Sequence, residues 1–202
     1  MTGTVFVKNY AAPVWDRREI LRYASCGAAD ERTSALLEEC IAQSEGMLSY
    51  NVCYARFPLE MGLGDIDLGF ARSKSENLRK NLASCREVVV FAATVGLGIE
   101  RLMARYAYAS PAKALMFDAI GSERVEALCD AFNAEIKAEA AKAGGFTRPR
   151  FSPGYGDLAL SLQKDIFRAL SPEKYIGATL GESLLISPSK SVTAIIGVGK
   201  DN

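Results

Sequence analysis

A continuous apolar run over residues 87–94 places the strongest constraint on the fold of this chain. Residues 88–93 read Val-Val-Val-Phe-Ala-Ala, so a strand formed here carries no polar side chain on either face. A strand with two apolar faces is typical of the centre of a sheet that is covered on both sides. The run therefore predicts a central strand buried on both faces.

Helical patterns occupy much of the remaining sequence. Apolar residues at three- and four-residue spacings predict the buried stripe of the longest helix: Val125, Leu128, Cys129, Phe132 and Ile136. Short polar side chains mark helix starts, because they accept the N–H groups that a first turn leaves unpaired. We expect six helices, over residues 15–23, 30–47, 73–84, 99–107, 110–143 and 157–170. Asp16 lies near the start of the first, Asp30 caps the second, Ser73 and Glu76 form a capping box for the third, and Asp157 caps the last. Gly121 is expected to kink or break the helix over residues 110–143.

Two further regions have strand patterns. Residues 48–57 alternate, which predicts a half-buried strand with Leu48, Tyr50, Val52 and Tyr54 on one side. Residues 178–187 and 191–197 predict two C-terminal strands, joined as a hairpin by residues 187–190, Ser-Pro-Ser-Lys. The whole chain, residues 1–202, is therefore predicted to form one domain of class α+β, with helices packed on a modest, mainly antiparallel twisted sheet.

Charge and composition limit the possible functions. Lysine and arginine total 24, as do aspartate and glutamate, so no basic excess draws the chain to nucleic acid or to an anionic membrane. Neither a membrane-spanning run nor the residue order of a signal peptide is found, so we expect a cytoplasmic protein. Histidine is absent, which excludes Ser-His-Asp and Cys-His catalysis and points to binding or to chemistry supplied by a cofactor.

Two glycine-rich segments leave a ligand site and a structural turn as alternatives. Asp65 and Asp67 lie among glycines and could share a cation, but a turn into a short strand explains them as well, since oxygen-ligand sites generally use more than two ligands. Residues 96–98, Gly-Leu-Gly, separate the central strand from a helix, an arrangement that can bind phosphate. Arg101 replaces the third glycine of the dinucleotide motif and no P-loop lysine follows, so a tight turn without ligand is the competing interpretation.

Residues 148–156, Arg-Pro-Arg-Phe-Ser-Pro-Gly-Tyr-Gly, form the most distinctive loop of the sequence. Proline fixes φ, glycine supplies backbone angles that other residues avoid, and guanidinium groups need an anionic partner or water. The loop is therefore predicted to be rigid, cationic and open to a ligand. The alternative is a structural connection whose arginines bind nearby carboxylates or the carbonyls at a helix C-terminus.

Several segments, in the same order, resemble the activation domain of cobalamin-dependent methionine synthase in a short, free-standing form. They are residues 91–98, 115–130, 150–155 and 180–194, so the resemblance is specific from about residue 88 onward. The family motif Arg-x-x-x-Gly-Tyr falls here on Arg150, Gly154 and Tyr155.

In that family the domain binds S-adenosylmethionine and docks over cobalamin that has been oxidised to its inactive cob(II)alamin form. An electron from a flavodoxin-type donor and a methyl group from S-adenosylmethionine then restore methylcobalamin. The resemblance implies that the arginine pairs with the ligand carboxylate, that backbone groups at residues 152 and 154 meet the adenine or ribose, and that the tyrosine offers an aromatic face. Asp130 would hold the ligand's ammonium or balance its sulfonium. The implied S-adenosylmethionine-binding residues are Asp130, Arg150, Ser152, Pro153, Gly154 and Tyr155.

The resemblance also implies partners and leaves three hypotheses. The partners are the cobalamin-binding module of methionine synthase, or a related corrinoid protein that carries the cobalamin, and a flavodoxin-type electron donor. The sequence differs from the long form of the family in two ways. A second acidic residue of the family would fall near Gly144 and is missing here. The long form also has a further strand, with a ligand-contacting tyrosine, beyond the position of Asn202. The hypotheses are an S-adenosylmethionine-binding activation subunit, a corrinoid-interaction module that keeps the fold without that ligand, and an independent methyltransferase, for which the usual glycine-rich motif is lacking.

Overall fold

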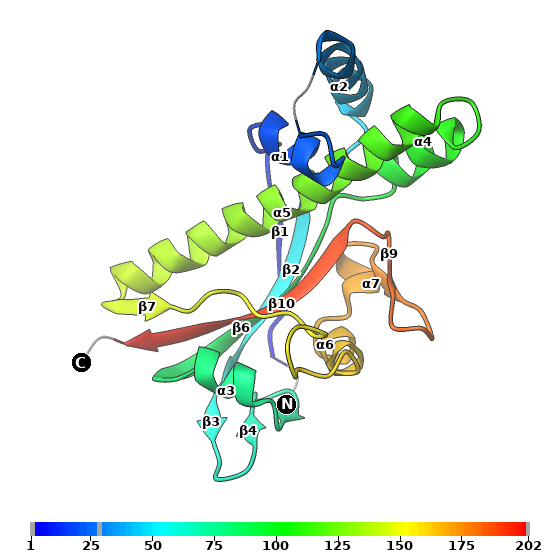
Figure 1. Cartoon of the computed structure of the whole chain (residues 1–202). Helices are drawn as coiled ribbons and strands as arrows, with labels where there is room; N and C mark the ends of the chain where they lie inside the picture. Colours follow the sequence, from blue (N-terminus) through cyan, green and yellow to red (C-terminus); the bar gives the residue numbers. More distant parts are fainter. Residues whose placement is uncertain (1–2, 28–29, 201–202) are drawn as a thin grey trace.

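An antiparallel five-stranded sheet in the order β1-β2-β6-β10-β7 lies at the centre of the molecule (Figure 1). The computed structural model describes residues 3–27 and 30–200. The predicted α+β class and the antiparallel pairing are confirmed. The strands of this sheet are β1 (Phe6–Asn9), β2 (Asn51–Pro58), β6 (Cys85–Thr94), β7 (Gly145–Thr147) and β10 (Ser191–Lys200).

The predicted central strand is β6, which pairs with β2 along one edge and with β10 along the other. Alternate side chains enter the two apolar clusters that cover the sheet, and each is at most 2% exposed: Val88, Val90 and Ala92 on one face, and Val89, Phe91 and Ala93 on the other. The prediction of a strand buried on both faces is therefore confirmed.

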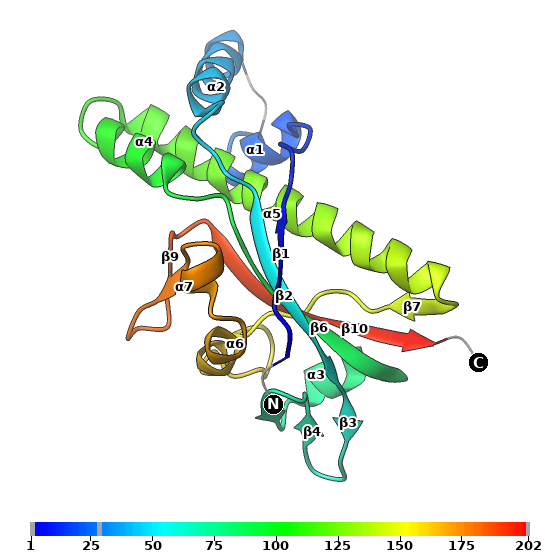
Figure 2. The ribbon, with the colours of Figure 1, turned by 180° about the vertical axis from the view of Figure 1, so that it is seen from behind.

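The long helix α5 (Pro111–Lys142) lies across one face of the sheet (Figures 1 and 2). It continues unbroken through Gly121, so the predicted break at this residue is wrong. Its C-terminal half presents the predicted apolar stripe to β2, β6 and β10, and all five residues of the stripe are buried.

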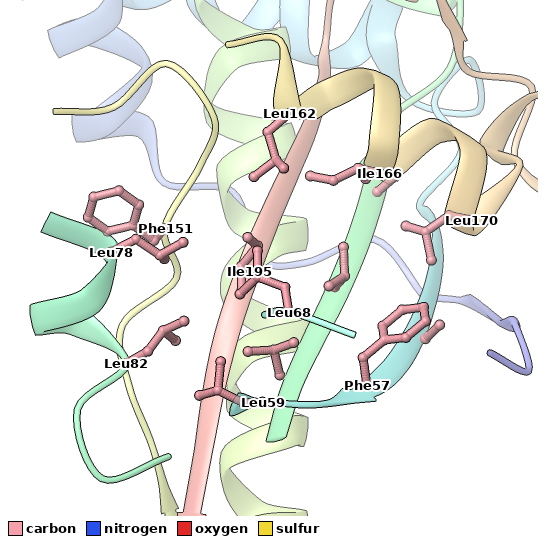
Figure 3. Packing of buried hydrophobic residues seen from close by; sticks show 14 of the residues in the cluster. Phe57, Leu59, Leu68, Leu78, Leu82, Phe151, Leu162, Ile166, Leu170 and Ile195 are labelled. Atoms are coloured by element: carbon pink, nitrogen blue, oxygen red, sulfur yellow. The ribbon is translucent and has the colours of Figure 1, made fainter. Parts of the chain in front are cut away.

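The opposite face of the sheet is covered by α3 (Glu76–Asn81) and α6 (Leu162–Leu170), together with Ile176 and Ala178, which follow α7 (Pro172–Tyr175). Figure 3 shows Leu162, Ile166 and Leu170 of α6 directed at the strands, where Ile195 and Phe57 meet them. Burial of each such side chain is worth roughly 1.5–3 kcal/mol, so this face contributes a large part of the stability.

A third apolar cluster joins α1 (Arg17–Tyr23), α2 (Glu31–Ser44) and α4 (Gly98–Tyr106) to the N-terminal half of α5. The predicted cap Asp30 is confirmed, because it accepts the N–H of Thr33, and Asp16, predicted to lie near the start of α1, accepts the N–H of Arg18. A Cβ at Gly98 would lie 2.1 Å from the Met47 carbonyl oxygen, so the glycine is required by close backbone packing. This contact favours the structural interpretation of residues 96–98.

Two small sheets complete the fold: β3 (Glu60–Met61), β4 (Ile66–Asp67) and β5 (Arg72–Ser73) form one, and β8 (Thr179–Leu180) and β9 (Ile186–Ser187) the other. The predicted C-terminal hairpin is wrong, because β10 pairs with β6 and β7 while β8 and β9 pair with each other. Arg72 binds both Asp65 and Asp67. Within the described ranges no group of three or more potential metal ligands is found.

Long-range contacts overturn two predicted caps. Asp157 does not begin a helix of its own; its carboxylate accepts the N–H of Glu76 at 2.8 Å and so caps α3, while α6 starts only at Leu162. The N-cap of α3 is Ser75, whose hydroxyl accepts an N–H in the first turn, so the capping box predicted from Ser73 is also wrong.

Two strands also differ from the prediction. β2 is buried on both faces rather than one, because α5 covers Val52 and Tyr54 while Cys53, Ala55 and Phe57 pack in the cluster on the opposite face. β1 was not predicted, and it forms the edge of the sheet beside β2. None of the described helices is long and apolar enough to cross a membrane.

Candidate functional site

The loop at residues 148–156 follows β7 and lies along the outer edge of β10. The Arg148 N–H donates to the Gly197 carbonyl at 2.8 Å, and Phe151 and Ile195 exchange two backbone hydrogen bonds of 2.9 Å each. Phe151 is buried on the same face as Leu78 and Leu82 (Figure 3). The edge of β10 therefore fixes the loop on both sides of Arg150.

The second half of the loop is a tight turn that requires its glycines. Gly154 has φ +87° and Gly156 φ +57°, a region that other residues rarely adopt. A Cβ at Gly156 would also lie 2.4 Å from Asn77 Nδ2. The Gly154 N–H donates to the Leu158 carbonyl at 2.8 Å, so this N–H is engaged within the turn. The predicted need for glycine in this loop is confirmed, while its rigidity stays a prediction.

Asp157 ties the end of the turn to α3. Its carboxylate accepts hydrogen bonds from the Ser75 hydroxyl and from the N–H groups of Glu76 and Asn77. The Ser75 hydrogen bond, followed by the backbone ones, holds the pKa of Asp157 below its usual range. On the other side of the turn, Asn81 Nδ2 donates to the Pro149 carbonyl at 3.2 Å, so α3 holds the loop at two points.

Arg150 extends from this loop to α5 and binds two carboxylates there. Its Nη1 lies 2.5 Å from Asp130 Oδ1, and its Nη2 donates to Glu126 Oε2. The Arg150 side chain is 23% exposed, whereas those of Glu126 and Asp130 are 40% and 72% exposed. We call these three residues the Arg150 cluster. The guanidinium is held in place, but its partners remain accessible to solvent and to a ligand.

The charge state of the Arg150 cluster is well defined. Partial burial acts to lower the pKa of Arg150, but the hydrogen bond to Asp130 and the nearby negative charges raise it overall, so the guanidinium stays protonated. Cys129 lies beside the cluster on α5, and burial raises the pKa of its thiol to about 12, so the thiol is neutral at physiological pH. The cluster thus contains one positive and two negative charges.

Tyr155 presents an aromatic surface on the loop that carries Arg150. Its side chain is 70% exposed, and its ring packs edge-on against buried Phe151, with 5.4 Å between the ring centroids. The Tyr155 N–H donates to the Ser152 carbonyl at 3.1 Å, and Pro153 is buried within the turn. An exposed ring on a rigid support can stack against a planar ligand at little entropic cost.

Two hollows border the loop and the cluster. One, of about 440 Å³, includes Glu126 and Asp130 in its lining together with Tyr23 of α1. The other, of about 270 Å³, is lined by residues of α5 and of the loop, among them Asn133 and Arg148. Asn133 Oδ1 is buried with no hydrogen-bond partner among the described residues, so it is not accessible from this hollow.

The structure gathers the predicted site residues on one loop and one helix. Asp130 contacts Arg150, and residues 152–155 follow on the same turn, but their roles in binding remain predictions. Glu126 was not predicted. The signal that could have identified it is its position four residues before Asp130, which places both carboxylates on one face of α5.

The fold of this chain is also found in a solved structure of another protein. The structure matches one described as the crystal structure of the MetH reactivation domain bound to AdoHcy, with a TM-score of 0.69 over 98% of this chain and 79% of that chain. The two sequences are 15% identical, so the likeness shows the fold alone. No protein-family model matches the sequence, and a search of curated proteins gives no match either. The resemblance predicted from the sequence is confirmed at the level of the fold.

Proposed function

We propose that this chain binds S-adenosylmethionine at the 148–156 loop and presents it to a corrinoid protein, as an activation subunit of cobalamin-dependent methionine synthase. The observation that carries the proposal is the Arg150 cluster on a rigid turn, within a fold that a structure bound to AdoHcy shares. AdoHcy is S-adenosylmethionine without its transferable methyl group, so the two ligands share the amino-acid and nucleoside parts that a protein recognises.

The chemistry of the Arg150 cluster suits the amino-acid end of this ligand. A guanidinium can bind a carboxylate through two parallel hydrogen bonds, which makes Arg150 the partner for the ligand carboxylate. Glu126 and Asp130 are then free to accept hydrogen bonds from the ligand ammonium. The Tyr155 ring is available to stack on the adenine.

The ligand brings the reactive group, and the chain positions it. When bound, S-adenosylmethionine supplies a methyl group to the cobalt of a corrinoid on a partner protein, after one electron from a flavodoxin-type donor has reduced that cobalt. This transfer needs no proton to be moved by the protein, which agrees with a sequence that contains no histidine. The chain therefore contributes binding, orientation and a docking surface for the partner.

Isothermal titration calorimetry with S-adenosylmethionine tests the proposal. The full chain is titrated alone and together with a separately produced cobalamin-binding module, and we expect saturable binding at one site. Arg150→Ala should weaken the binding by about 10- to 100-fold, because hydrogen bonds between charged groups are lost.

Arg148→Ala is the matched control. It removes the same charge from the same loop, but the Arg148 guanidinium donates to the Ala83 carbonyl and not to the cluster. Its affinity should stay within about twofold of the original, since the Arg148 guanidinium is held by the Ala83 carbonyl, away from Glu126 and Asp130, and salt screens the remaining effect of its charge. If the unmodified chain binds no S-adenosylmethionine, either alone or with the cobalamin-binding module, the proposal is refuted.

A second candidate is an interaction module for a corrinoid protein that does not bind S-adenosylmethionine. The observation in its favour is that the Arg150 guanidinium already has two carboxylate partners. This candidate predicts co-purification with the corrinoid protein and a melting temperature that S-adenosylmethionine does not change. A rise in melting temperature with the ligand would exclude it, since only a ligand that binds the folded state raises that temperature.

A further inference from the structure

Asp157 connects the end of the 148–156 loop to a helix that is distant in sequence. Its Oδ1 accepts hydrogen bonds from the Ser75 hydroxyl and from the Asn77 N–H at 3.2 Å. Its Oδ2 accepts the Glu76 N–H at 2.8 Å. Because Asp157 follows Tyr155 by two residues, these hydrogen bonds fix the chain directly after the turn.

A second contact with α3 holds the other end of the loop. Asn81 Nδ2, in the last turn of α3, donates to the Pro149 carbonyl at 3.2 Å, and Pro149 directly precedes Arg150. The Arg150 guanidinium reaches away from this segment to the carboxylates of α5. Arg150 is therefore carried by a segment that α3 holds on both sides.

α3 can fix the loop because the rest of the fold fixes α3. A helix of six residues is not stable on its own, so contacts outside the helix must stabilise it. Leu78 and Leu82 are buried and pack in the same apolar cluster as Phe151 (Figure 3). Arg79 donates to two carbonyls in the turn between β3 and β4, both at 3.0 Å.

We propose that Asp157 is a positioning residue for ligand binding, which holds the loop in the conformation that directs Arg150 at α5. The inference rests on the proposed function, because it concerns the affinity of the same site. Asp157 acts through the loop and not by touching the ligand, since both of its carboxylate oxygens bind donors at the start of α3. When this attachment is lost, a smaller fraction of the molecules is competent to bind, and the apparent dissociation constant rises by the inverse of that fraction.

The size of the effect follows from the hydrogen bonds that are lost. The Asp157 carboxylate acts on α3 as a cap does, and removal of a helix cap disfavours the capped arrangement by about three- to tenfold in a typical case. Asp157→Ala should therefore weaken the binding of S-adenosylmethionine by about three- to tenfold. Asp157→Asn keeps an acceptor oxygen and should weaken it less, by about two- to fivefold.

Isothermal titration calorimetry with S-adenosylmethionine compares these variants with the unmodified full chain. The matched control is Asp165→Ala, which removes an aspartate that binds Arg168 on its own helix, α6. Its affinity should stay within about twofold of the original, because an exposed pair of this kind contributes little. Each titration is made well below the melting temperature of the variant, so that a loss of stability alone does not change the affinity.

A double-mutant cycle distinguishes positioning from an independent contribution to binding. In the Arg150→Ala background the main group that the loop positions is absent, so Asp157→Ala should weaken binding by about twofold or less. Amide hydrogen exchange gives a second readout. The Gly154 N–H, which donates to the Leu158 carbonyl, should exchange faster in Asp157→Ala than in the unmodified chain and slow again when S-adenosylmethionine saturates the site.

The outcomes separate this inference from the proposed function. If Asp157→Ala binds S-adenosylmethionine as tightly as the unmodified chain, or loses the same factor with and without Arg150, the inference is wrong and the proposed function stands. Should Asp157→Ala fail to fold, Asp157→Asn decides in the same way, and an unchanged affinity overturns the inference. If the unmodified chain does not bind S-adenosylmethionine, the proposed function itself fails, and the inference with it.

Discussion

Two arginines form ion pairs with carboxylates of α5, and the two ion pairs differ in their exposure to solvent. Arg124 lies within α5 and binds its neighbour Glu123, and the side chains are 0% and 5% exposed. Arg150 approaches the same helix from a loop, and its partners Glu126 and Asp130 are 40% and 72% exposed. The chemistry of the two pairs is the same, and only their surroundings differ.

Arg124 has all of its partners within the fold. Its Nη1 donates to the Pro13 carbonyl at 2.7 Å and its Nη2 to the Val14 carbonyl at 2.9 Å, and its guanidinium lies 4.1 Å from the centre of the Trp15 ring. These contacts hold the segment before α1 against α5. Because its partners are the buried Glu123, two backbone carbonyls and the half-buried Trp15 ring, we infer a structural role for Arg124, whereas Arg150 is the residue proposed to bind the ligand.

The largest expected effect breaks the buried pair. Arg124→Met leaves the Glu123 carboxylate buried without a counter-charge, which should lower the free energy of unfolding by about 3–5 kcal/mol. Urea denaturation monitored by circular dichroism measures this loss. The double variant Arg124→Met with Glu123→Gln should recover part of it, because the unpaired charge is gone. A loss below about 1 kcal/mol in the single variant would contradict a structural role.

A smaller effect is expected when the exposed pair is removed. Arg150→Ala should lower the free energy of unfolding by no more than about 1 kcal/mol, because water can solvate the carboxylates it leaves behind. The same urea titration measures it, with Arg148→Ala for comparison. A loss as large as that of Arg124→Met would show that Arg150 is mainly structural and would weaken its assignment to ligand binding.

The smallest effect concerns the attachment of the loop that carries Arg150. The folded-state pKa of Asp157 is depressed by its hydrogen bonds to α3, so its contribution to stability is complete above its unfolded pKa of about 3.9 and is lost as pH falls through the folded value. Stability measured from about pH 7 down to about pH 3 should therefore fall more steeply for the unmodified chain than for Asp157→Asn. Parallel curves would show that the attachment does not depend on the ionised carboxylate.

Local sequence signals predicted the elements whose partners lie within a few residues. Asp30 caps α2 as expected, since a cap accepts N–H groups two or three positions ahead. The apolar stripe of α5 and the two apolar faces of β6 were likewise predictable, because each follows from the period of its own segment.

Contacts between distant residues could not be predicted in this way. Asp157 caps a helix through Ser75, which lies 82 positions away, so its local context as the start of a helix was misleading. Glu126 meets Arg150 across 24 positions; its spacing from Asp130 indicates a shared helix face, but not which residue of the loop that face contacts. The family resemblance identified the loop and the motif, whereas the second carboxylate of the site became visible only in the structure.

A structure of this chain crystallised with S-adenosylmethionine is the most direct test of the account. We predict that the Arg150 guanidinium leaves at least one carboxylate of α5 and binds the ligand carboxylate through both of its terminal nitrogens, with Glu126 or Asp130 on the ligand ammonium and Tyr155 beside the adenine. The contradicting result is a ligand that is absent from the 148–156 loop, with Arg150 still bound to Glu126 and Asp130 as in the structure without ligand.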